Sequence, residues 1–236
     1  MRLLCLAPLS VGCGFGLDSA LAPSVPEGGF SSGEMSEPPA DAEADDLPAT
    51  AVDLEGKLYT LTAADMVVTQ PPGLNGLWDQ VLTRPLLVQV AGEDEESLSL
   101  LAALGTASGE QDPCESVRRF PDADWSANPV FDAGPGLLST SFGGSPATLR
   151  DVQLGGVIDE YGFGWRDGTM AATVDTRELR AALPEVNDLC ALVETLGGEC
   201  ITCSDGEPAC FVLEITDITA HYSEADFDPT PNRDGC

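Results

Sequence analysis

From Lys57 onward, short runs of β-branched and aliphatic residues alternate with Gly, Pro, Asp and Asn. In residues 210–220, Phe211, Leu213 and Ile215 occupy every second position, which is the period of a strand with one buried face. Further strands are expected at 57–62, 86–91, 97–103, 148–158 and 169–175. We therefore predict a mainly β fold with short helices, arranged as an antiparallel sandwich or barrel and stabilised by disulfides. An α+β arrangement is the alternative.

Two or three short helices are expected between these strands. They cover residues 74–82, 176–183 and 185–196. The first and third place apolar side chains at helical spacing, and the second begins with Asp175 and Glu178 in the spacing of a capping box. Asp167-Gly168 lies between two expected strands and predicts a tight hairpin turn, because such turns require positive φ angles.

The chain contains eight cysteines, of which six remain when Cys5 and Cys13 are set aside. An even number in an exported chain indicates disulfides, three in this case, although fifteen pairings are open. We predict the pairs Cys114–Cys236, Cys190–Cys200 and Cys203–Cys210. The last pair would span a turn, the second would tie the third helix to the next strand, and the first would close a long loop.

Two other uses of the cysteines remain open. Thiolates from Cys190, Cys200, Cys203 and Cys210 match the ligand number of a zinc site, although only Cys200 and Cys203 are closely spaced. A redox Cys-x-x-Cys normally begins a helix, whereas residues 200–203 resemble a strand that enters a hairpin. We favour disulfides and expect no metal and no cofactor.

Residues 1–12 resemble a leader peptide. One arginine precedes a short apolar run, and small residues stand before Cys13. Gly12-Cys13 resembles the lipobox of bacterial lipoproteins, and this resemblance implies that Cys13 becomes the lipidated N-terminus of an envelope protein. It implies a cell-envelope or extracellular location, on the outer membrane or the cell surface, with the membrane as a partner. Simple secretion, or a cytoplasmic chain with a chance cysteine, are the alternatives.

Residues 13–56 are acidic and rich in proline, and contain no Lys or Arg. A segment of this composition buries too little apolar surface to offset the entropy lost on ordering. We predict that it is a disordered tether between the leader and a single β-rich, disulfide-containing domain at 57–236.

The balance of charges excludes one class of partner. The chain has 40 acidic and 10 basic residues, which gives a formal net charge of −30, and Lys57 is its only lysine. Nucleic-acid binding depends on positive patches that displace counterions from phosphates. We therefore expect no nucleic-acid partner.

The sequence offers few candidates for catalysis or metal binding. His221 is the only histidine, and its position just after a strand favours a surface residue. Acidic clusters lie at 93–96 and at Asp226, Asp228 and Asp234, but neither follows the spacing of a calcium loop. We predict solvated charges at both clusters and assign no catalytic residue.

Tyr161, Phe163 and Trp165 alternate with glycine close to an expected hairpin. Aromatic rings in such a place offer flat faces to a sugar or an apolar ligand, although packing over a neighbouring strand is the commoner use. These three residues are our candidate ligand contacts.

The hypothesis drawn from the sequence is an exported, lipid-anchored envelope protein that acts by binding or as a structural component rather than as an enzyme. Its partner is a protein, a glycan or an apolar ligand. Two alternatives remain: a carrier of a small ligand or lipid in an apolar barrel interior, and an extracytoplasmic hydrolase that uses carboxylates.

Overall fold

The computed structural model describes residues 47–142, 145–234 and 236. The predicted leader at 1–12, the lipidation site Cys13 and most of the predicted tether at 13–56 lie outside the described residues. Within the described residues, no helix is both long and apolar enough to cross a membrane.

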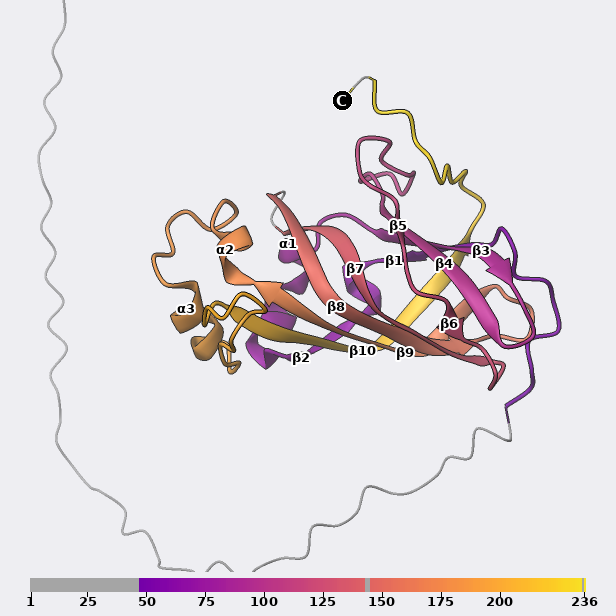
Figure 1. Ribbon diagram of the computed structural model, residues 1–236, viewed down its shortest axis with the longest axis horizontal. Coiled ribbons are helices and arrows are strands. Elements are labelled where there is room, and N and C mark those ends of the chain that lie inside the picture. The colour runs from indigo at the N-terminus through magenta and orange to yellow at the C-terminus, as the bar shows by residue number, and fades with distance from the viewer. Residues whose placement is uncertain (1–46, 143–144, 235) are drawn as a thin grey trace, which may run out of the picture. The chain divides into compact units, whose positions relative to one another are not determined.

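The described residues form one antiparallel sheet that closes in a ring (Figure 1). Its strands are β1 (Leu58–Leu61), β2 (Val67–Gln70), β3 (Leu86–Glu93), β4 (Ser97–Leu104), β5 (Arg118–Arg119), β6 (Ala123–Asp124), β7 (Val130–Phe142), β8 (Ser145–Ile158), β9 (Gly164–Asp175) and β10 (Cys210–Ser223). They follow the order β1-β3-β4-β6-β7-β8-β9-β10, and β10 pairs with β1 as well as with β2. The predicted mainly β fold is confirmed, and the ring corresponds to the barrel alternative.

Large side chains fill the interior of the ring. Trp125, Tyr59 and Phe131 are almost fully buried, together with leucines from β1, β3, β4 and β8. The indole of Trp165 lies between two of these aromatic side chains. Its centroid is 5.3 Å from that of Tyr59 and 5.1 Å from that of Phe131. The interior is therefore a packed core, which is the usual state of small rings of strands.

Three aspartates bend the long strands. Asp151, Asp167 and Asp217 have φ angles of 51°, 52° and 52°, and the pairing register shifts beside each of them. Each marks a β-bulge, where one strand carries an extra residue and twists more strongly. The prediction of a hairpin turn at Asp167-Gly168 is wrong, because these residues lie inside β9. Asp167 does have the expected positive φ, but it forms a bulge within the strand. The chain reverses earlier, at residues 159–163.

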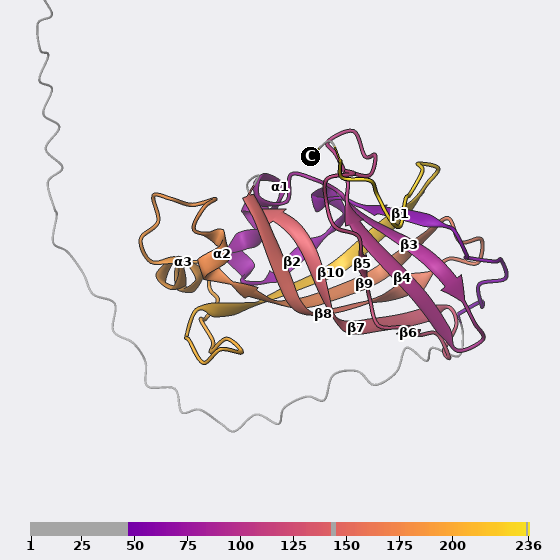
Figure 2. The ribbon, with the colours of Figure 1, turned by 45° about the horizontal axis from the view of Figure 1, so that its top comes forward.

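The helical segments are η2 (Ala63–Asp65), η3 (Pro72–Leu77), α1 (Trp78–Val81), α2 (Thr176–Leu179) and α3 (Leu189–Thr195). All except η2 lie around one end of the strands (Figure 2). η3 and α1 together cover 72–81, close to the predicted helix at 74–82, whereas α2 and α3 are shorter than the predicted helices at 176–183 and 185–196. Asp175 caps α2, as its position predicts, but Glu178 does not complete the capping box. Its carboxylate instead accepts hydrogen bonds from Thr148 N and from Arg150.

Four strands lack a clear signal in the sequence. β2, β5 and β6 are too short to show an alternating pattern, and β7 contains Gly134-Pro135-Gly136, which resembles a loop. A Cβ at Gly134 would lie 2.3 Å from the carbonyl oxygen of Val152 on β8. Glycine is thus required there because two backbones approach closely.

Residues 47–56 pack on the ring, although they fall in the predicted tether. Leu54 is fully buried, and its backbone N donates to Glu93 Oε2 at 2.7 Å. Thr50 is also buried, and its backbone N donates to Asn128 Oδ1 at 2.8 Å. Ordered packing therefore begins before Lys57.

Candidate functional site

Three exposed aromatic rings meet at the turn between β8 and β9. Tyr161 and Phe163 belong to this turn, and Tyr222 comes from the end of β10. Their ring centroids are 6.4 Å apart for Tyr161 and Phe163, and 6.2 Å apart for Phe163 and Tyr222. The three residues are 59%, 63% and 40% exposed, and we call them the aromatic cluster.

Lys57 holds the aromatic cluster together. Its Nζ lies 5.4 Å from the ring centroid of Phe163 and 5.5 Å from that of Tyr222. The same ammonium donates hydrogen bonds to the carbonyl oxygens of Tyr161 and Gly162, at 3.1 and 3.2 Å. One cation thus contacts two rings and two turn carbonyls, which limits the motion of all three aromatic residues.

The backbone of the turn is fixed from two further sides. Asp159 Oδ1 accepts hydrogen bonds from the backbone N of Tyr161 and of Phe163, at 2.8 and 3.0 Å. From the core, the hydroxyl of Tyr59 donates to the carbonyl oxygen of Gly162 at 3.2 Å, and burial raises the pKa of Tyr59 well above its usual value. The rings of Tyr161 and Phe163 are therefore presented by a preorganised turn.

Glycine is required at position 162 of this turn. Its φ is +65°, and a Cβ would lie 2.8 Å from Leu54 Cδ2 and 2.8 Å from Lys57 Nζ. A side chain there would displace the lysine from the two rings.

The structure brings together two of the three predicted contact residues. Trp165 is only 2% exposed and packs inside the ring, so it does not reach the surface. Trp165 pairs with Ala220, two residues before Tyr222, so it lies further along the same strands, where the core begins. The Gly-spaced pattern alone does not show where the core begins. Lys57 and Tyr222 are not among the predicted contacts, because both reach the site through long-range strand pairing.

The three disulfides are those predicted from the spacing: Cys114–Cys236, Cys190–Cys200 and Cys203–Cys210. Four of these cysteines are the ones that we considered for a zinc site. Because their sulfur atoms are joined in disulfides, they cannot act as thiolate ligands, and the zinc interpretation is wrong.

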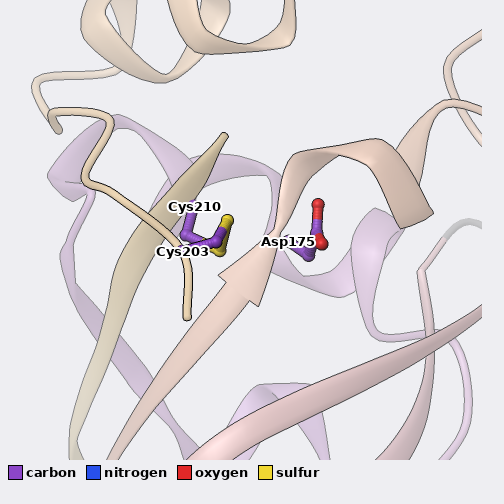
Figure 3. A group of neighbouring side chains, drawn as sticks. All are labelled: Asp175, Cys203 and Cys210. Carbon is purple, nitrogen blue, oxygen red and sulfur yellow. A yellow bond between two sulfur atoms is a disulfide. The ribbon is translucent and has the colours of Figure 1, made fainter. Parts of the chain in front are cut away.

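The Cys203–Cys210 disulfide lies beside a carboxylate (Figure 3). Among the described residues, Asp175, Cys203 and Cys210 form the one group of three or more Asp, Glu, His or Cys side chains whose ligand atoms lie within 4.8 Å of one another. Two of the three atoms are disulfide sulfurs, so this group is not a metal centre but a buried contact between the end of β9 and the start of β10.

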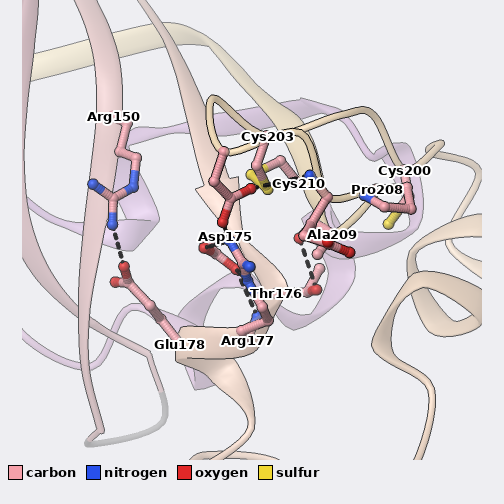
Figure 4. The surroundings of a disulfide bond; sticks show 12 residues. Arg150, Asp175, Thr176, Arg177, Glu178, Cys200, Cys203, Pro208, Ala209 and Cys210 are labelled. Carbon is pink, nitrogen blue, oxygen red and sulfur yellow. Dashed lines mark hydrogen bonds and ion pairs between the residues drawn. A yellow bond between two sulfur atoms is a disulfide. The ribbon is translucent and has the colours of Figure 1, made fainter.

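Arg177 links this contact to the neighbouring turn (Figure 4). Its Nη2 lies 2.7 Å from Asp175 and 2.7 Å from Asp205. Hydrogen bonding to Arg177 lowers the pKa of Asp175, and a backbone hydrogen bond from Glu207 together with Arg177 lowers that of Asp205. Beside them, Thr176 donates from N and Oγ1 to the carbonyl oxygen of Ala209, at 2.8 Å each. The polar groups of this network form hydrogen bonds and ion pairs with one another, which is typical of a structural role.

The remaining predicted sites are surface features. His221 Nε2 lies 3.5 Å from Asp65 Oδ1, and 65% of its side chain is exposed. Glu93 accepts the hydrogen bond from Leu54, and Asp228 accepts one from Thr230 N at 2.8 Å. The structure does not bring Glu93–Glu96 or the C-terminal aspartates into a metal-binding group among the described residues.

Three disulfides around a closed β-ring indicate an extracytoplasmic protein. No protein-family model, no curated protein and no solved structure matches the chain.

Proposed function

We propose that this chain is an exported binding protein of the cell envelope whose aromatic cluster binds a neutral glycan. Lipidation at Cys13 and anchoring to a membrane are part of the proposal and depend on the resemblance of residues 1–13 to a lipoprotein leader. Binding, rather than catalysis, is the proposed activity.

The observation that carries the proposal is the exposed position of three rings, two of them on a rigid turn and the third at the end of β10. Large exposed aromatic residues are unfavourable in water, and when they gather on a surface they commonly mark a contact site. Lys57, Asp159 and the hydroxyl of Tyr59 fix the turn, so little entropy is lost when a ligand binds. The tyrosine hydroxyls add polar groups at the rims of the rings.

Charge favours a neutral, hydroxyl-rich ligand. The net charge of −30 repels polyanions such as acidic polysaccharides and nucleic acids. Asp159 and Glu160 lie in the same turn, and hydrogen bonding to Glu160 raises the pKa of Tyr161. Sugar hydroxyls can donate to carboxylates while the C–H faces of the sugar stack on the rings.

The experiment is a binding titration of the purified protein against soluble neutral polysaccharides, compared with Phe163→Ala and Tyr161→Ala. Each variant should weaken binding at least fivefold, about 1 kcal/mol, because a stacking face is lost. Leu137→Ala is the control, since Leu137 is also a large exposed hydrophobic residue, at 47%, but lies outside the aromatic cluster. Equal losses in all three variants, or none in the first two, would contradict the proposal.

The proposed anchor has a separate test. The intact mass of protein extracted from host membranes should begin at Cys13 and include acyl chains. An unmodified mass that retains residues 1–12 would remove the anchor from the proposal and leave glycan binding to be judged by the titration.

A further inference from the structure

An apolar cavity lies at the other end of β9 and β10, away from the aromatic cluster. It has a volume of about 320 Å³ and lies between η3, α1, α2, α3 and the ends of β7 and β10. This volume is at the lower end of the range for small-molecule sites. Side chains fill the interior of the closed sheet, where a carrier would hold its ligand. This cavity lies outside that interior, between the helices.

The walls of the cavity are almost wholly hydrocarbon. Leucines 74, 179, 192 and 196, with Phe142 and Phe211, form much of the lining, and Gln80 and Thr176 are its polar members. No lining residue carries a charge, although the chain as a whole is strongly acidic. The part of a ligand inside the cavity must therefore be apolar and uncharged.

The rim of the cavity is apolar as well. Leu77 and Leu183 line it and are 43% and 39% exposed. They belong to the few large hydrophobic residues exposed in the described part of the chain, most of the others being the aromatic cluster. An apolar rim beside an apolar cavity suits a ligand that enters from water by its hydrocarbon end.

A cation stands next to this rim in the chain. Arg180 follows Leu179, is exposed, and precedes the lining residues Ala182 and Leu183. Every other arginine from Arg84 to Arg233 makes a hydrogen bond or ion pair with a described partner. Arg180 makes none with the described residues, so its charge is available to an anionic group outside the cavity.

We infer that this cavity binds a single unbranched fatty acid, with the alkyl chain between the helices and the carboxylate at Arg180. The cavity volume allows one chain rather than a two-chain lipid. The charge of Arg180, which lies in the chain between the lining residues Leu179 and Ala182, favours a fatty acid over a neutral hydrocarbon or alcohol. The site is independent of the glycan site, because the two occupy opposite ends of β9 and β10.

The test is displacement of a fluorescent fatty acid from the full-length protein by unbranched fatty acids of increasing length. Affinity should rise about tenfold for each two added methylenes and then level off when the cavity is full. Ala182→Trp fills the cavity and should weaken binding at least tenfold. Ala181→Trp is the matched control, because Ala181 is the exposed neighbour that does not line the cavity.

Arg180→Glu tests the position of the carboxylate. This variant should bind the fatty acid at least fivefold more weakly than the parent protein, and should bind the alcohol of equal length with unchanged affinity. The inference is overturned if affinity does not depend on chain length, if Ala182→Trp binds as well as Ala181→Trp, or if Arg180→Glu affects acid and alcohol equally. It is also overturned if the protein forms dimers that Ala182→Trp disrupts, because a second copy would then occupy the cavity. None of these outcomes bears on glycan binding.

Discussion

Arg177 donates two side-chain hydrogen bonds to Asp175, from Nε to Oδ1 at 2.8 Å and from Nη2 to Oδ2 at 2.7 Å. The carboxylate also accepts from the backbone N of Arg177 at 2.9 Å, as the cap of α2. One side chain thus joins a buried strand end, a helix start and, through the same guanidinium, the turn at Asp205.

Asp175→Asn should lower the free energy of unfolding by about 1 to 3 kcal/mol at pH 7, since asparagine still caps the helix but forfeits the charge-assisted bonds. The pKa of Asp175 is lowered in the folded state from 3.8. Its contribution is therefore complete above pH 3.8 and is lost as pH falls through the folded value. Denaturant unfolding of both proteins between pH 7 and 2 should show the difference shrinking below pH 4. A constant difference over this range would contradict the assignment.

The three disulfides should open in a fixed order under mild reduction of the folded protein. Cys114 and Cys236 are exposed, whereas Cys203 and Cys210 are only 7% and 1% exposed and lie beside the Asp175 carboxylate, which repels an attacking thiolate. Alkylation followed by peptide mass mapping should find Cys114–Cys236 reduced first and Cys203–Cys210 last. Early loss of the buried pair would show that the contact with Asp175 opens readily.

Trp165→Ala should destabilise the fold by about 3 to 5 kcal/mol, because it leaves a cavity between Tyr59 and Phe131. Tyr161→Ala should change stability by less than about 0.5 kcal/mol, since its ring is exposed. Chemical denaturation measures both. A large loss for Tyr161→Ala would mean that the aromatic cluster is part of the structural core.

Asp167→Val should have a free energy of unfolding about 1 to 2 kcal/mol lower than that of Asp167→Gly. The φ of this exposed bulge residue is 52°, which glycine adopts freely and a β-branched residue does not. Thermal unfolding of the two variants gives the difference. Equal stabilities would show that the bulge relaxes to another conformation.

Leu54→Ala should lower the free energy of unfolding by about 2 to 5 kcal/mol, because the side chain is fully buried against the core. Val52→Ala is a milder comparison, since Val52 is only partly buried there. If both variants unfold like the parent protein, residues 47–56 do not contribute to the stability of the ring.

The alternation in residues 210–220 is a local signal and is sufficient to predict a strand. Cys190–Cys200 and Cys203–Cys210 are separated by only 10 and 7 residues, so their spacing also indicates the pairing. Cys114–Cys236 joins residues 122 apart, and no local pattern indicates this pair. Asp167 was recognised as a position of positive φ, but a local pattern does not distinguish a hairpin turn from a bulge. β7 was missed because Gly134 and Pro135 resemble a loop until the close approach to Val152 is known. The contact of Lys57 with Phe163 depends on pairing between segments about a hundred residues apart. Periodic patterns in the sequence report local structure and do not predict such a contact.

Lys57 also gives the protein an unusual chemical property, because it carries the only side-chain amine in the chain. An amine-reactive dye or cross-linker has a single side-chain target, and this target lies within 5.5 Å of two rings of the aromatic cluster. Acylation there removes the charge that faces both rings. Immobilisation through this amine turns the aromatic cluster toward the support, whereas attachment elsewhere leaves it open to solution.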